Sequence, residues 1–179
     1  MSQIGNVYGR ALYDLVKEEG LSDRILQELT VLEQSFREEP QFLRLLSAHN
    51  ISVEERCGIV DSCFHDSVHI YVLNFLKILT QKAVVKSFSA CVQAFTELYN
   101  EDHGILPVTA VSAVALSQEQ IKRLSEKLSD ITGKKALITN RVDPDCLGGV
   151  RLDYDGKRVD GSVANRLASV RNMLKNTVL

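Results

Sequence analysis

The stretch from Val142 to Ser162, VDPDCLGGVRLDYDGKRVDGS, holds five aspartates and four glycines. Aspartate oxygens bind calcium and glycine-rich turns cradle phosphates, so this composition could serve a metal ion or a phosphate. A helix-loop-helix calcium loop needs ligands at positions 1, 3 and 5, glycine at 6 and glutamate at 12. Counted from Asp143, position 5 is Leu147; counted from Asp153, Gly156 arrives two residues early. Neither register fits calcium.

Phosphate-loop templates fail in the same region. The glycine patterns GxxxxGK[ST] and GxGxxG must open a helix, whereas CLGGVR leads into a strand and TGKKA lacks the upstream glycine and the Ser/Thr. Turn chemistry explains these residue types instead, through turn starts, a strand entry, a tight hairpin and a helix cap. The residues concerned are Asp143, Gly148, Gly149, Asp155-Gly156, Asp160, Gly161 and Ser162. We therefore predict no catalytic, cofactor-binding or metal-binding residue in this stretch.

Two cysteines and two histidines form a second candidate site. His65 and His69 are four residues apart, a spacing that would place both on one helical face for zinc. The Asp-Ser pair at 66–67 is typical of a helix start, which would leave His65 outside the helix. Cys57 and Cys63 lack the spacing of a tight zinc-binding pair. We predict surface histidines and reduced, partly buried thiols; a small zinc-dependent enzyme using Cys63, His65 and His69 is the alternative.

Composition excludes several function classes. The net charge is -2 and no basic cluster is present, which argues against nucleic-acid binding. The sequence contains no GxSxG motif and no carboxylate pair singled out by its surroundings. No apolar run reaches the roughly 18–20 residues of a membrane helix, and the start MSQIGNVYGRALYDL has no apolar leader. These patterns predict a cytoplasmic, bacterial-type protein that is not an enzyme.

Helical periodicity dominates the first hundred residues. Apolar residues recur three and four apart from Ile4 to Leu15, and five further segments show a similar pattern or a helix-start signal. Ser52, three residues before Glu55, predicts a capping box that opens one of these helices. We expect an all-α six-helix bundle over residues 1–105, ending where Gly104 and Pro107 break the periodicity.

The pattern changes after residue 105. Alternating Val, Thr and Ala residues predict a strand, Ser117 predicts a helix start, and Asp155-Gly156 predicts a hairpin between two later strands. Val163, Leu167, Val170 and Leu174 fall on one stripe of a final helix. The predicted order is β-α-β-β-β-α, a small α/β domain over residues 106–179. The predicted fold class is thus two domains, all-α and then α/β.

Four segments resemble one known family. YGRALYDLV carries Tyr8, Ala11 and Leu12, VLNFLKIL carries Asn74 and Phe75, and VTAVSAVALSQEQ resembles a strand followed by a helix start of that family. VDPDCLGGVRL followed by VDGSVANRLASV resembles its most specific signature. The chain resembles the delta subunit of bacterial F-type ATP synthase, the counterpart of the mitochondrial oligomycin-sensitivity-conferring protein. One departure lies at residues 80–86, which lack the glycine and arginine found in the turn of many members.

The resemblance implies a non-catalytic stator component of the ATP synthase, without cofactors, on the cytoplasmic face of the bacterial cell membrane. It implies that the first domain binds N-terminal helices of the alpha subunits and that the second contacts the b subunits, with one copy in a hetero-oligomer. We expect the first interface in a groove between the first and sixth helices, at Tyr8, Ala11, Leu12, Leu15, Val92 and Phe95. An adaptor of an unrelated assembly is the alternative.

Overall fold

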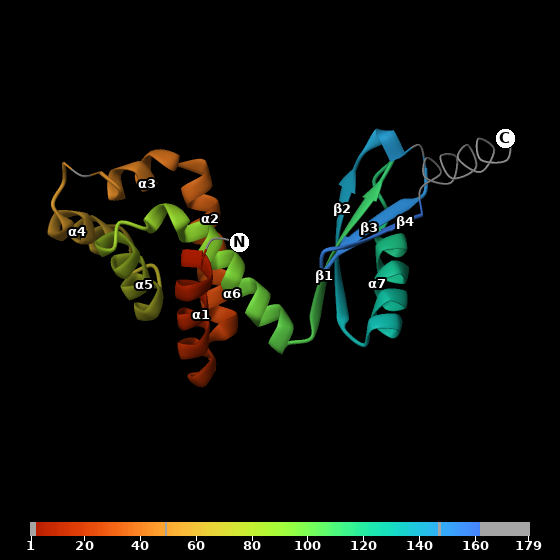
Figure 1. Cartoon of the computed structure of the whole chain (residues 1–179), viewed down its shortest axis with the longest axis horizontal. Helices are drawn as coiled ribbons and strands as arrows, with labels where there is room; N and C mark the ends of the chain where they lie inside the picture. The colour runs from red at the N-terminus through yellow and green to blue at the C-terminus, as the bar shows by residue number, and fades with distance from the viewer. Residues whose placement is uncertain (1–2, 49, 147, 162–179) are drawn as a thin grey trace, which may run out of the picture. The chain divides into compact units, whose positions relative to one another are not determined.

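The computed structural model describes residues 3–48, 50–146 and 148–161. The chain forms two compact units, Met1–Tyr99 and Asn100–Leu179 (Figure 1). The first unit is helical and the second is α/β, as the change in periodicity predicted. The division lies six residues before the boundary expected at 105, because helix α6 (Phe88–Asp102) runs across it and its last turn belongs with the second unit.

Helices make up the first unit, and several of their ends follow local sequence signals. Ser52 accepts a hydrogen bond from the Glu55 N–H, and the Glu55 side chain accepts one from the Ser52 N–H, which is the predicted capping box. Pro40 occupies the first turn of its helix, where its missing N–H is not needed. The remaining elements are α1 (Gln3–Glu18), α2 (Ser22–Glu38), α3 (Pro40–Leu46), α4 (Val53–Phe64), α5 (Ile70–Gln81) and the short 3₁₀ helix η1 (Val85–Ser87).

The core of the first unit is formed by one stripe from each helix. α5 contributes the most apolar stripe, including the fully buried Leu76 and Leu79. Aromatic rings join the neighbouring helices, and Phe36 of α2 meets Phe88 of α6 edge to face at 5.0 Å between ring centroids. Such edge-to-face contacts are favourable because the positive ring edge meets the negative ring face.

α1 and α6 approach each other unusually closely. A Cβ atom placed on Gly9 would lie 2.4 Å from the Cys91 carbonyl oxygen, and one on Gly5 would lie 2.7 Å from Ala90. The backbones can come this close only because both positions lack a side chain. The pair of glycines four residues apart therefore fixes the side of α1 that faces α6.

The segment that departs from the family pattern forms the turn after α5. Ala83 adopts a left-handed backbone conformation with φ of 55°, a region that favours glycine. The turn is closed by the N–H of Val84, which donates to the Leu79 carbonyl at 2.9 Å. The chain thus makes the turn without glycine and accepts the backbone strain of an alanine.

The second unit is a mixed four-stranded sheet with one described helix packed on it. Strands β1 and β2 are parallel, while β3 is antiparallel to both β1 and β4, in the order β2-β1-β3-β4. The elements are β1 (Ile105–Ser112), α7 (Gln118–Thr132), β2 (Lys135–Val142), the 3₁₀ turn η2 (Pro144–Cys146), β3 (Val150–Tyr154) and β4 (Lys157–Asp160). The predicted final helix, with Val163 and Leu167, lies outside the described residues.

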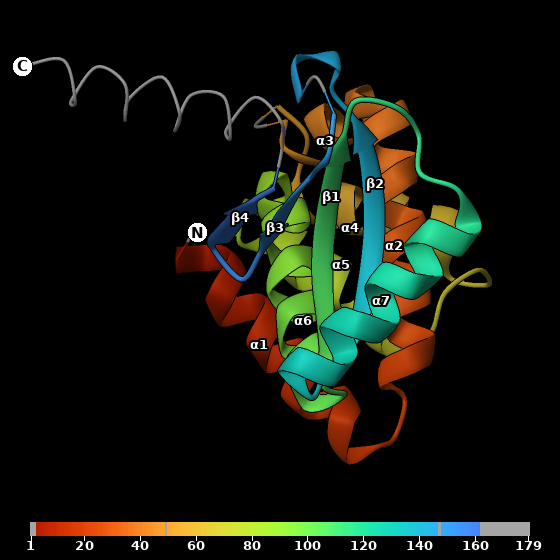
Figure 2. The ribbon, with the colours of Figure 1, turned by 90° about the vertical axis from the view of Figure 1, so that its right-hand side faces the viewer.

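Local sequence signals also determine where the helix and the hairpin of the second unit begin and end. Ser117 and Gln120 form the capping box of α7, and Gly133 ends the helix with a left-handed φ of 68°. Asp155 and Gly156 both have positive φ, as a two-residue hairpin between β3 and β4 requires. α7 lies across β1 and β2 (Figure 2), and the small core between helix and sheet is built around Val108 and Leu128.

Candidate partner-binding surfaces

Three of the six residues predicted to contact a partner are core residues. Leu12, Val92 and Phe95 are 5%, 4% and 0% exposed, so their side chains pack inside the first unit. The prediction that these three residues contact a partner is therefore wrong. The predicted groove between α1 and α6 is closed, because the Gly9 side of α1 rests directly on α6 and leaves no room for a partner helix.

The other three predicted residues lie at the surface. Tyr8 is half-buried, while Ala11 and Leu15 are exposed. They share a stripe of α1 with Ile4 and Val7, beside the buried stripe that contains Leu12. α1 therefore has two apolar stripes, and only one of them faces the core. Their contact with a partner stays a prediction.

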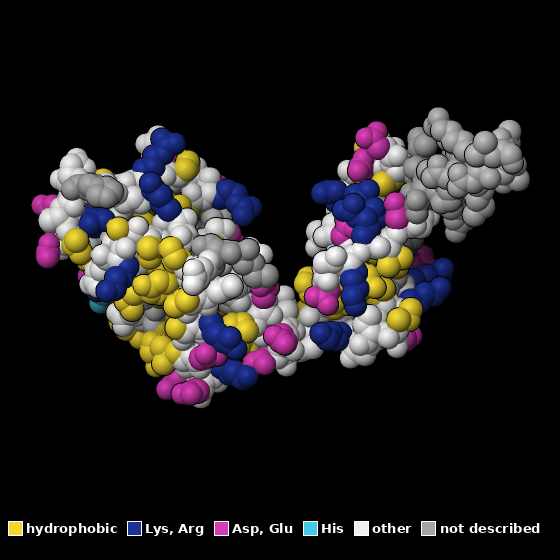
Figure 3. All heavy atoms as spheres, viewed as in Figure 1, with side chains coloured by type: hydrophobic (Ala, Val, Ile, Leu, Met, Phe, Trp, Pro, Cys, Tyr) yellow, Lys and Arg dark blue, Asp and Glu magenta, His cyan; other side chains and the backbone are white. Residues whose placement is uncertain are grey.

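α5 carries a matching set of exposed apolar residues. Ile70 and Ile78 are both exposed, eight residues apart on the side of α5 away from its buried stripe. α1 and α5 contact each other. Figure 3 shows hydrophobic side chains gathered on the first unit where Figure 1 places these two helices. We call this set, Ile4, Val7, Leu15, Ile70 and Ile78, the α1–α5 surface.

The two α5 residues that carried the family resemblance have different roles. Phe75 is buried and contacts the ring of Phe88 at 6.3 Å between centroids. Asn74 is exposed, midway between Ile70 and Ile78 on the same stripe. Asn74 is thus a polar residue within an otherwise apolar exposed stripe. The sequence alone did not distinguish its position from a core position.

The histidines of the zinc alternative do not share a helix. His65 lies just beyond α4, and His69 caps α5, where its Nδ1 accepts a hydrogen bond from the Tyr71 N–H at 3.3 Å. The helix cap was expected at 66–67 and is instead His69. Within the described ranges, no group of three or more His, Cys, Asp or Glu residues could hold a metal ion.

The aspartate- and glycine-rich stretch forms turns. The Asp143 carboxylate accepts from the Asp145 N–H at 3.2 Å, so the side chain itself closes the turn. Gly148 and Gly149 have φ of 143° and 78°, which strongly favours glycine at the entry to β3. Asp160 ends β4, and the Gly161 N–H donates to the Val150 carbonyl. Ser162 lies outside the described residues.

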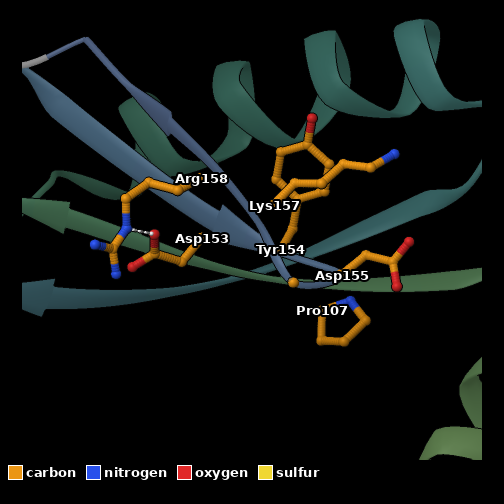
Figure 4. Close-up of a pocket in the computed structure, with 7 residues that line it drawn as sticks. Pro107, Asp153, Tyr154, Asp155, Lys157 and Arg158 are labelled. Carbon is orange, nitrogen blue, oxygen red and sulfur yellow. Dashed lines mark hydrogen bonds and ion pairs between the residues drawn. The ribbon is translucent and has the colours of Figure 1, made fainter.

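A hollow of about 490 Å³ lies beside the β3–β4 hairpin (Figure 4). Its lining includes Pro107 of β1 and the hairpin from Asp153 to Arg158. Arg158 Nε donates to the Asp153 carboxylate at 2.7 Å, and this hydrogen bond lowers the pKa of Asp153 below its usual value. A carboxylate held ionised by a guanidinium forms a salt bridge and is poorly suited to take up a proton.

The first unit thus offers an apolar surface, and the second offers a small sheet stabilised by turns and salt bridges. Apolar surfaces of this kind are characteristic of protein–protein contacts. The fold defines a protein of two units, one helical and one α/β, with an exposed apolar surface on the helical unit.

Comparison with known proteins places the chain in one family. Residues 4–174 match the ATP synthase delta (OSCP) subunit family. The ATP synthase subunit delta of Lactobacillus johnsonii is 34% identical over 96% of this chain and 94% of that protein. The subunit of the same name from Clostridioides difficile is 31% identical over 98% of this chain and 97% of that protein. The chain belongs to the ATP synthase delta (OSCP) subunit family, whose members are non-catalytic stator subunits of the peripheral stalk of F-type ATP synthase.

A solved structure has the same fold. A chain of the Toxoplasma gondii mitochondrial ATP synthase hexamer aligns with a TM-score of 0.74, with 17% identity, over 97% of this chain and 98% of that chain. The complex to which the family belongs is membrane-associated. In the ranges that the structure describes, no helix combines the length and apolar character needed to cross a bilayer.

Proposed function

We propose that the first unit, acting as a six-helix bundle, binds N-terminal helical segments of the alpha subunits through the α1–α5 surface. The second unit meets the ends of the b subunits. The chain thereby joins the peripheral stalk to the catalytic head at the cytoplasmic face of the membrane. In this position it opposes rotation of the head while the central rotor turns.

The observation that carries this proposal is the exposed apolar stripe on each of two contacting helices. Val7 is 61% exposed, and Ile4, Leu15, Ile70 and Ile78 also expose large aliphatic side chains. Full burial of a fully exposed aliphatic side chain contributes roughly 1.5–3 kcal/mol, so these residues, which are 39–61% exposed, each contribute a correspondingly smaller share when a partner covers them. Apolar residues three, four and seven apart on a partner helix could cover such a surface.

The two helices are held firmly enough to present a constant surface. Gly5 and Gly9 fix α1 against α6, while the fully buried Leu76 and Leu79 fix α5 in the core. A surface that does not rearrange loses little conformational entropy on binding. Slow dissociation, which a stator needs, follows from extensive contacts on a rigid surface.

The test is binding of a peptide that corresponds to the alpha-subunit N-terminus, measured by calorimetry with the full-length chain. Val7→Asp and Ile78→Asp place a carboxylate in the α1–α5 surface, and we expect each to weaken binding at least tenfold, equivalent to about 1.4 kcal/mol or more. Val31→Asp is the matched control. Val31 is as exposed as Val7 but lies on α2, away from that helix's buried stripe.

Circular dichroism must show that all three variants remain folded. If Val7→Asp and Ile78→Asp bind the peptide as tightly as Val31→Asp, the alpha segments bind elsewhere. Tyr8→Asp and Ala11→Asp extend the same test along α1, where Tyr8 is half-buried and Ala11 is exposed.

A further inference from the structure

One face of the sheet in the second unit has no helix on it among the described residues. α7 covers the face that contains Leu106, Val108 and Ala136. Side chains alternate along strands, so the intervening residues point to the other side. We call this other side the open sheet face and define it by Pro107, Leu137, Arg141, Arg151, Asp153, Arg158 and Asp160.

The open sheet face is rich in arginine. The strand register places Arg141 of β2, Val111 of β1 and Arg151 of β3 side by side, so two guanidinium groups flank a buried valine. Arg158 lies opposite Asp153 in the neighbouring row. Three cationic side chains thus come from three different strands and gather on one surface.

The carboxylate of Asp153 is already engaged. It accepts from Arg158 at 2.7 Å and lies 3.7 Å from Arg151 Nε. Arg141 is exposed, and within the described residues no ion pair joins it to a carboxylate. The buried Nε of Arg151 also has no hydrogen-bond acceptor there. Asp160 lies opposite Arg151 on the same face and favours the charged form of Arg158. Three arginines thus share two carboxylates among these residues, and the guanidinium left without an ion pair is that of Arg141.

The same face has an apolar part. Leu137 is 60% exposed, and its strand neighbour Pro107 is exposed as well. The hollow of about 490 Å³ lies beside Pro107, between the hairpin residues shown in Figure 4. Because most of its lining is charged, an aliphatic or aromatic anchor from a partner would contact Leu137 and Pro107 beside the hollow.

We propose that the open sheet face binds one amphipathic helix whose contacting side presents carboxylates to Arg141 and an apolar anchor to Leu137. This rests on the proposed function, in which the helical partner is the end of a b subunit. Four strands about 4.8 Å apart form a face roughly 15–20 Å wide, which suits a single helix of about 10–12 Å diameter.

Charge distinguishes this occupant from the chain's own C-terminal segment. Residues 162–179 contain Arg166, Arg171 and Lys175 and no acidic residue. A basic segment does not complement a surface that keeps Arg141 without an ion pair among the described residues, whereas an acidic helix does.

The test uses the full-length chain and the soluble segment of the b subunit from the same organism, with affinity measured at low and at high salt. We expect Arg141→Glu to weaken binding roughly 3- to 30-fold, because attraction is replaced by repulsion at an exposed site. Leu137→Asp should weaken it at least as much. Lys127→Glu is the matched control, since Lys127 is exposed on α7 and the charge change is the same.

The salt dependence adds an independent readout. Wild-type binding should weaken with salt, and Arg141→Glu should reduce that dependence, because salt screens exposed charges. If Arg141→Glu and Leu137→Asp both remain folded and bind the b segment with normal affinity, the open sheet face is not the binding site. That result would leave the b-subunit partnership itself intact. Failure of the wild-type chain to bind the b segment would overturn the partnership itself.

A photo-crosslinking residue at position 137 identifies the occupant directly. A crosslink to the b segment supports the proposal. A crosslink to a second copy of the chain, or to residues 162–179 of the same chain, overturns it.

Discussion

Gly9 offers the sharpest test of how the first unit is assembled. In an exposed helix, replacing glycine with alanine stabilises the protein by about 0.5–1 kcal/mol, because alanine loses less conformational freedom on folding. Gly58 is such a position: it lies in α4, is exposed, and an added Cβ would meet nothing within 4 Å. We therefore expect Gly58→Ala to raise the free energy of unfolding by that amount.

Gly9→Ala should have the opposite effect. The added methyl group would lie 2.4 Å from the Cys91 carbonyl oxygen, well inside the 3.4 Å at which ordinary contact begins. The atom it meets is backbone, so α1 would have to move by roughly 1 Å, and overpacking of this kind costs about 1–3 kcal/mol. Because the propensity gain is shared by both variants, the difference between them measures the cost of the close approach.

Urea unfolding followed by far-ultraviolet circular dichroism measures both values. We expect Gly9→Ala to be less stable than Gly58→Ala by about 1–3 kcal/mol, with unchanged denaturant slopes. Binding of the alpha-subunit peptide should also weaken in Gly9→Ala, because a shifted α1 presents a distorted α1–α5 surface. If Gly9→Ala stabilises the chain as much as Gly58→Ala does, the close packing of α1 on α6 is refuted.

Three further predictions concern turns and titration. Ala83→Gly should stabilise the chain by about 0.5–1 kcal/mol in urea unfolding, since glycine relieves the left-handed strain at φ 55°; no gain would show that the turn is unstrained. Gly149→Asp should reduce incorporation into the purified ATP synthase, because φ of 78° disfavours a side chain at the entry to β3, and normal incorporation would contradict this. The Tyr99 hydroxyl donates to Asp23 at 2.5 Å, and this hydrogen bond raises the pKa of Tyr99 above its usual 10.0. The stabilisation that this hydrogen bond gives the folded protein is therefore present below pH 10, and it is lost as the pH rises through the folded-state pKa of Tyr99. Tyr99→Phe should flatten the decline in stability above pH 10, and an unchanged decline would exclude this contribution.

Local sequence signals predicted much of the fold correctly. The helix starts at Ser52 and Ser117 and the hairpin at Asp155-Gly156 all appear where the sequence placed them. Each depends on residues within a few positions of one another, so the chemistry is complete before any distant contact forms. The same reasoning correctly explained Asp143, the pair Gly148-Gly149 and the pair Asp155-Gly156 as turn and strand-entry residues, whereas the helix cap predicted at Ser162 lies outside the described residues.

The partner surface could not be predicted in this way. Leu12 and Leu15 have the same side chain and lie three residues apart, yet one is buried and the other exposed. Val92 and Phe95 likewise looked suitable for a partner and are core residues.

Periodicity shows which residues share a face of a helix but not which neighbour covers that face. α6 covers the Gly9 side of α1 because only there can the two backbones meet, and the adjacent stripe with Val7 and Leu15 is left exposed beside α5. The secondary structure and the family resemblance were thus readable from the sequence. The division of the apolar residues between core and surface required the packing of helices that are distant in the chain.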